Sequence, residues 1–222
     1  MSIEVIKWCL QHIGYIPFTK GVEIGANMNL FDGTTAMRIA AYAHERTDTV
    51  IATDDPSFPI GTNLIGASGA DVDTWGAELE LSSRPIDGLE VNAAIGYLDT
   101  EYKSFQSTIG DFTGNEIALL YNWTASIQAT YRHPLGSTNL NMFYYGLYTA
   151  KQDGWLDDAN TMEADDTGRI NLKIGIEAET WRLIAYVDNA SDEVDIAYQN
   201  PRNQFRTYTH GRTYGLQLAL DF

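Results

Sequence analysis

Apolar and polar residues alternate strictly along residues 121–132, and this period of two constrains the fold more than any other feature of the sequence. One face would carry Tyr121, Trp123, Ala125, Ile127, Ala129 and Tyr131, and the other Asn122, Thr124, Ser126, Gln128, Thr130 and Arg132. Successive side chains of a strand point to opposite faces, whereas a helix would scatter the polar groups around its circumference. The segment is therefore predicted to be a β-strand with one apolar and one polar face.

The alternation recurs in nine segments between residue 21 and the last residue. The predicted strands cover residues 22–30, 36–51, 75–82, 89–97, 121–132, 138–151, 169–177, 181–187 and 214–222. Short connections that contain Pro, Gly or Asp alternate with long polar connections at about 52–71, 103–120, 152–166 and 189–210. Short turns on one rim and long loops on the other are typical of bacterial transmembrane barrels.

Three observations favour a membrane-spanning sheet over a soluble sandwich, which also alternates because one face packs and the other is wet. Several predicted strands reach the roughly ten residues that a tilted strand needs to cross a bilayer. Aromatic side chains such as Tyr121 and Trp181 stand near the ends of the apolar faces, where interfacial girdles lie. The polar faces carry mid-strand charges, among them Glu78 and Lys173, which suit a hydrated lumen. The predicted fold is therefore all-β, an antiparallel transmembrane β-barrel.

The composition argues against several other classes of protein. The net charge of −16 disfavours a nucleic-acid partner, because phosphate binding needs clustered Lys and Arg. No uninterrupted apolar run reaches the roughly 18 residues of a transmembrane helix. Cys9 is the single cysteine, and the four histidines lack metal-ligand spacing. We therefore expect no cofactor, no metal site and no enzymatic activity.

The C-terminal segment looks like the signal by which outer-membrane proteins are recognised by the barrel assembly machinery. Its apolar positions are Tyr214, Leu216, Leu218, Leu220 and the terminal Phe222. A terminal Phe alone is weak evidence, but it follows an apolar residue at every second position. This series predicts the assembly machinery as a partner and outer-membrane lipid as the surroundings of the folded chain.

Several phrases of the sequence resemble the barrels of TonB-dependent receptors, and they occur in the expected order. They are the segments 23–33, 75–80, 84–103, 181–193 and 212–215, which include Trp75-Gly-Ala-Glu-Leu-Glu80 and Arg84-Pro-Ile-Asp-Gly88. Each phrase is degenerate, and the specificity comes from their succession over about residues 20–222.

The resemblance implies a 22-stranded barrel with a plugged lumen, the size class of outer-membrane transporters, and import driven through contact with TonB. Residues 21–222 would be the last nine strands of such a barrel. We find no plug domain in this sequence, so the TonB system would be reached only through a plug outside it. Residues 1–20 are expected to be a loop remnant or an artefactual start, because their apolar and polar residues do not separate cleanly.

The resemblance implies a small-molecule ligand such as a ferric siderophore. Amphipathic aromatic residues suit ligand contact, and the candidates are Trp155 and Tyr198 in long loops and Phe143 and Tyr145 facing the lumen. The acid-rich loop at 157–166 could bind cations or could be a solvated external loop, and the second interpretation is favoured. Two alternatives remain for the whole chain: a small complete pore, or a barrel enzyme such as a lipase or protease. The enzyme would need a Ser/His/Asp cluster at one rim.

Overall fold

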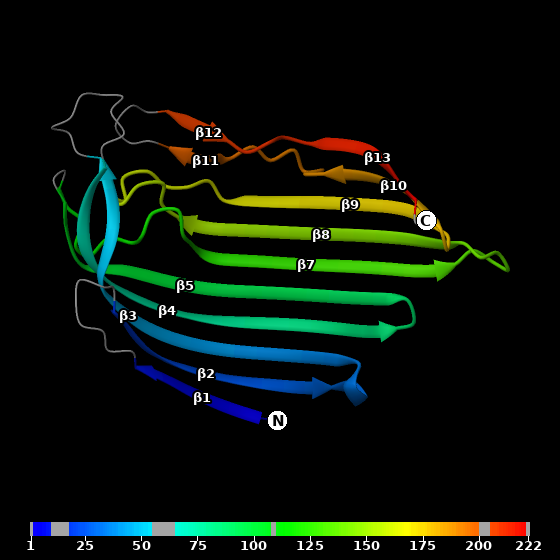
Figure 1. The fold of residues 1–222 in the computed structure, drawn as a ribbon, viewed down its shortest axis with the longest axis horizontal. Coiled ribbons are helices and arrows are strands. Elements are labelled where there is room, and N and C mark those ends of the chain that lie inside the picture. Colours follow the sequence, from blue (N-terminus) through cyan, green and yellow to red (C-terminus); the bar gives the residue numbers. More distant parts are fainter. Residues whose placement is uncertain (1, 10–17, 55–64, 108–109, 200–204, 221–222) are drawn as a thin grey trace.

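The computed structural model describes residues 2–9, 18–54, 65–107, 110–199 and 205–220, and these form an almost entirely antiparallel β structure (Figure 1). The main strands are β1 (Ser2–Cys9), β2 (Phe18–Leu30), β3 (Thr35–Asp54), β4 (Ile65–Ile86), β5 (Leu89–Ser107), β7 (Tyr121–Pro134), β8 (Asn141–Gly154), β9 (Thr167–Glu177), β10 (Trp181–Asp188) and β13 (Thr213–Leu220). Each pairs with the next, so they follow one another across a single sheet that does not close into a barrel.

Three short strands and one short helix complete the described elements. β6 (Gly110–Asp111) pairs with the end of β5, and β11 (Ile196–Gln199) pairs with β12 (Arg206–Tyr208). The 3₁₀ helix η1 (Phe31–Gly33) forms the turn between β2 and β3. Among the described residues, no helix is long and apolar enough to cross a membrane.

The nine predicted strands correspond to β2–β5, β7–β10 and β13, which confirms the all-β antiparallel prediction. The short turns lie at one end of the sheet and the long connections at the other, as Figure 1 shows. The β4–β5 turn illustrates why the short links are tight. Gly88 has a positive φ of 78°, a conformation that costs other residues energy because of their Cβ.

Two features differ from the sequence-based expectation. Residues 2–9 form β1, which pairs with β2 in register from Ser2↔Asn27 to Cys9↔Lys20, where a loop remnant was expected. Strands β3, β4 and β5 continue into the polar stretches predicted as loops, and they reach 20, 22 and 19 residues. Backbone pairing does not require a long apolar face, so these extensions lack the sustained alternation from which a strand is predicted.

The apolar face predicted for lipid is exposed across the sheet. Ile127 on β7 is 49% exposed, and Leu216 on β13 is 76% exposed. Trp75, Tyr97 and Trp123 form an aromatic ladder across three strands, with ring centroids 5.0 and 4.8 Å apart. Exposed apolar side chains over a whole sheet face fit a wall surrounded by hydrocarbon.

The buried apolar cluster of the described residues lies at the loop end and not within the membrane-spanning wall. It consists of Ala70, Val72, Tyr102, Phe105 and Phe112. These residues come from the extended ends of β4 and β5 and from the connection that follows β5. The long hairpins therefore carry a small core of their own, which gives the loops a packed base.

Candidate functional site: the polar face and the loops above it

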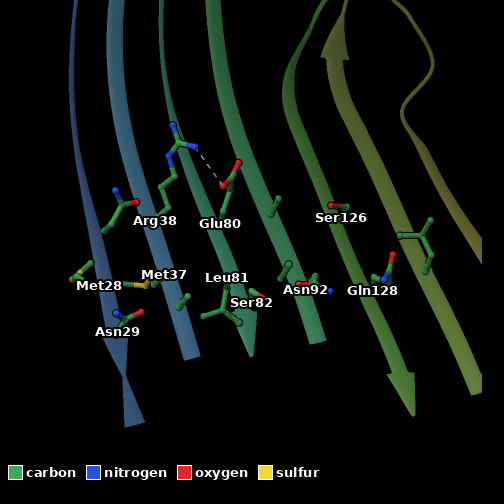
Figure 2. A pocket seen from close by; sticks show the side chains of 15 residues that line it. Met28, Asn29, Met37, Arg38, Glu80, Leu81, Ser82, Asn92, Ser126 and Gln128 are labelled. Atoms are coloured by element: carbon green, nitrogen blue, oxygen red, sulfur yellow. Dashed lines mark ion pairs between the residues drawn. The ribbon is translucent and has the colours of Figure 1, made fainter. Parts of the chain in front are cut away.

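The polar face of the sheet is built row by row from the strand register. Asn29, Ser82, Asn92 and Gln128 stand in one row across β2, β4, β5 and β7, with Ala36 between the first two. They help to line a hollow of about 730 Å³, shown in Figure 2. This volume lies in the range of small-molecule sites, and its polar lining suits a hydrated lumen.

Ion pairs join strands on the same face. Arg38 on β3 pairs with Glu80 on the adjacent β4, and Arg132 on β7 reaches across β8 to Glu177 on β9. Arg38 and Glu80 are 4.0 Å apart, as the dashed line in Figure 2 marks. Arg132 and Glu177 are 3.2 Å apart, and this pair lies nearer the turn end. Pairs as exposed as Arg38 and Glu80 contribute at most about 1 kcal/mol to stability. Their main consequence is that this face is compatible with water and incompatible with lipid.

Phe143 and Tyr145 lie on the polar face of β8, and each is covered by a cation of the chain itself. Phe143 is only 7% exposed, and the Arg132 guanidinium carbon lies 4.8 Å from its ring centroid. The Lys173 ammonium is 5.3 Å from the Tyr145 ring, and the Tyr145 hydroxyl donates to Gln128 Oε1 at 3.4 Å. A ligand at these rings would have to share them with Arg132 and Lys173.

Trp155 and Tyr198 lie at the loop end, away from the first two candidates. Trp155 follows β8 and forms an isolated β-bridge with Glu163, while Tyr198 on β11 is 43% exposed. Tyr145 and Trp155 are ten positions apart, which corresponds to roughly 33 Å along an extended strand. The structure therefore does not bring the four candidate residues together in one site.

The acid-rich loop is ordered by its own carboxylates, and the expectation of a simply solvated loop is wrong for Asp157. That residue is 8% exposed, and its carboxylate accepts hydrogen bonds from the Thr161 amide, the Thr161 hydroxyl and the Met162 amide. Asp158 accepts from the Tyr102 hydroxyl at 2.8 Å. In the described part of the chain, no group of three or more His, Cys, Asp or Glu is arranged to hold a metal ion.

Three long connections pack together into one unit, which we call the loop cluster (residues 110–120, 155–166 and 189–199). The Asn115 side chain donates to the Asp158 carbonyl at 2.8 Å, and the Glu116 amide donates to Asn160 Oδ1 at 2.7 Å. Gln199 Nε2 lies 2.9 Å from Met162 Sδ. The loops above the polar face are therefore held to one another as well as to their strands.

The most buried polar contact joins the loop cluster to the polar face, and sequence reasoning missed it. Asp195 precedes β11 and is 2% exposed. Its carboxylate pairs with the Arg169 guanidinium of β9 and with Lys151 Nζ of β8 at 3.1 Å, and it accepts from Thr209 Oγ1 at 2.6 Å. Nothing in the sequence separates Asp195 from the neighbouring acids Asp192 and Glu193.

The surroundings of Asp195 keep it ionised. Burial alone raises the pKa of its carboxyl, but the hydrogen bond from Thr209 and the charges of Lys151 and Arg169 outweigh burial and leave the pKa below its ordinary value. The group therefore carries its negative charge at neutral pH and acts as a fixed counter-ion to two cations.

The residues of the predicted assembly signal occupy the apolar face of the last strand. Tyr214, Leu216, Leu218 and Leu220 are between 54% and 81% exposed on β13. Phe222 lies outside the described residues. The exposed series agrees in placement with the prediction, and its role in assembly stays a prediction.

Comparison with known proteins identifies the family. The family model described as "TonB dependent receptor-like, beta-barrel" matches residues 18–190. The chain belongs to this family. Membership places it in the outer membrane of Gram-negative bacteria, and the described sheet is a part of a receptor barrel.

Solved structures share the fold of this TonB-dependent receptor barrel at low sequence identity. The ferric yersiniabactin uptake receptor FyuA from Yersinia pestis matches 93% of the chain with a TM-score of 0.76 and 16% identity. BauA, the ferric preacinetobactin receptor from Acinetobacter baumannii, matches 90% with a TM-score of 0.69 and 18% identity. The copper transporter OprC matches 93% with a TM-score of 0.66 and 15% identity. The chain spans 30%, 29% and 32% of these proteins, respectively.

Proposed function

We propose that this chain forms the C-terminal part of the barrel of a receptor that imports a scarce ligand, such as a ferric siderophore, across the outer membrane. The observation that carries the proposal is the charged polar face with the loop cluster folded over it. A face lined by ion pairs and hollowed by about 730 Å³ suits the wall of a hydrated path. Two of the structural relatives named above are receptors for ferric siderophores, which supports this class of ligand.

Residues 21–222 supply the last nine strands of a 22-stranded barrel, and β1 pairs with the first of these strands. The plug that contacts TonB comes from sequence outside this chain. Trp155 and Tyr198 contact the ligand at the loops, where it enters, and Phe143 and Tyr145 contact it at a later position, in the lumen. The barrel assembly machinery inserts the receptor, and outer-membrane lipid surrounds its apolar face.

The test is uptake of iron complexes by cells that lack the receptor carrying this chain. Iron-starved deletion cells should lose accumulation of at least one radiolabelled ferric siderophore, and the restored gene should return it. A second deletion, in the TonB system, should abolish the same uptake. Uptake that continues without TonB would contradict the proposal and favour a passive pore. Uptake of every siderophore at the parental rate in the deletion strain would contradict a role in iron import.

A further inference from the structure

The loop that follows β10 is tied to the polar face through one buried carboxylate. Asp195 lies between Lys151 on β8 and Arg169 on β9, and Thr209 donates to it from the far side of the same loop. Thr209 Oγ1 also accepts from Arg169 at 2.6 Å. The Asp195 contacts therefore help to hold both sides of the β11–β12 pair to the polar face.

The cluster holds more positive than negative charge. Lys151 and Arg169 share Asp195, and no other carboxylate of the described residues lies within ion-pair distance of either cation. Arg169 Nε is buried and has no hydrogen-bond partner in the described structure. A buried donor without a partner is costly, so an anion that took the place of Asp195 would gain a donor that is unused in this structure. This excess stands out in a chain whose net charge is −16.

A cavity of about 420 Å³ adjoins the two cations. Its lining includes Lys151, Arg169 and the hydroxyl-bearing residues Thr124, Ser126, Thr149 and Thr167. The register Ser126↔Thr149↔Arg169 and Thr124↔Lys151↔Thr167 places all six on the polar face in two adjacent rows. Hydroxyl, ammonium and guanidinium groups all donate hydrogen bonds, so this lining suits an anion.

We propose that Lys151 and Arg169 form a luminal anion-binding site that Asp195 occupies in the absence of ligand, and that an anionic ligand displaces Asp195 and releases its loop. The ligand class is a chelate with a net negative charge carried by carboxylate or catecholate oxygens. Planar guanidinium binds paired oxygens of this kind in a bidentate manner. An uncharged tris(hydroxamate) complex offers no charge to compete with the Asp195 carboxylate.

The inference rests on the proposed uptake function for the ligand class, so loop release and iron uptake are measured separately. The intact receptor that carries this chain is purified and treated with trypsin, and cleavage after Arg206, on the exposed strand β12, reports loop release by mass spectrometry. The trianionic Fe³⁺ tris(catecholate) complex should raise the cleavage rate several-fold. The uncharged Fe³⁺ tris(hydroxamate) complex should leave it unchanged.

Variants separate the site from general loosening of the loop. D195N should raise cleavage without any ligand, because it removes the internal anion. R169Q should weaken binding of the tris(catecholate) complex roughly ten-fold, the loss expected for one charge-assisted hydrogen bond. The matched control is D192N, which removes another carboxylate of the same loop. Asp192 Oδ2 lies 3.1 Å from Arg212 Nη2, and neither residue lines the cavity. It should leave the effect of the tris(catecholate) complex on cleavage intact.

Three results would overturn the inference. The first is that D195N cleaves at the parental rate, which would show that Asp195 does not hold the loop. The second is that the tris(catecholate) complex leaves cleavage unchanged. The third is that R169Q binds this complex as tightly as the parent does. If cleavage responds as expected while cells import no iron complex, the anion site stands and the proposed function fails.

Discussion

At the scale of single residues, alternate positions of one strand meet two different solvents. Ile127 and Gln128 are neighbours on β7, yet Ile127 is 49% exposed among apolar side chains and Gln128 lines the polar hollow. Successive Cβ atoms of a strand point to opposite faces, so sequence alternation alone predicts this division. Asp195 is the opposite case, because its importance comes from Lys151 and Arg169, which stand far from it in the sequence.

A charge placed on the two faces should therefore have unequal costs. I127R in the complete receptor barrel should destabilise the protein by about 2–4 kcal/mol if the position lies near the bilayer midplane, because the guanidinium would enter hydrocarbon. Q128R should cost little, since that side chain faces a hydrated surface. Urea unfolding in lipid vesicles measures both free energies of unfolding. Equal losses for the two variants would contradict the assignment of faces on β7.

At the scale of elements, turn geometry sets how the hairpins close. A Cβ on Gly88 would overlap the carbonyl oxygen of Arg132, whose amide donates to the Gly88 carbonyl at 2.8 Å. Gly136, in the β7–β8 turn, also has a positive φ, of 59°, but a Cβ there would meet nothing within 4 Å. The two glycines thus share a backbone conformation and differ in their surroundings.

Substitution by alanine separates these two effects. G136A should cost about 1–2 kcal/mol, the penalty of a left-handed conformation for an ordinary residue. G88A should cost about 1–3 kcal/mol more, because the added methyl group must also displace the Arg132 backbone. The same urea titration in vesicles gives both values. A G88A variant no less stable than G136A would show that β5 and β7 can separate locally without cost.

The terminal residue Phe222 tests whether the C-terminal segment acts as an assembly signal. F222D should reduce assembly into the outer membrane strongly. The reason is that Phe222, which lies outside the described residues, continues in the sequence the apolar series of Tyr214, Leu216, Leu218 and Leu220. Asp221 falls on the opposite face by alternation, so D221N is the mild control. Heat-modifiable folded barrel is measured as a fraction of total receptor in outer-membrane preparations. Assembly of F222D at the parental level would remove the C-terminal segment as an assembly signal.

At the scale of the whole molecule, the described sheet has two edges, β1 and β13. Unpaired backbone groups at an edge find no water in hydrocarbon, so an open sheet of this kind is not a stable membrane structure by itself. In the family to which the chain belongs, further strands are expected to satisfy both edges. The loop cluster likewise forms only in the folded sheet, because its three connections follow different strands, β5, β8 and β10.

The 222 residues alone should therefore neither conduct nor transport. Expressed alone, the chain should aggregate or be degraded, because the edges of β1 and β13 remain unpaired. Planar-bilayer recordings on the purified chain provide the test. Discrete and reproducible single-channel conductance would contradict the expectation and support a small complete pore.

The sequence by itself determined the β-strand period, the apolar and polar faces, the alternation of short turns and long loops, and the family. The first three of these features are local, because a period of two and a turn residue act within a few positions. The family, in contrast, follows from the ordered succession of several phrases along the chain. The tertiary structure alone decided that β3, β4 and β5 continue beyond the alternating segments, that Asp157 is buried, and that Asp195 reaches Lys151 and Arg169. Those outcomes depend on contacts between strands and loops distant in sequence, and their energy comes from burial and charge pairing that no local pattern records.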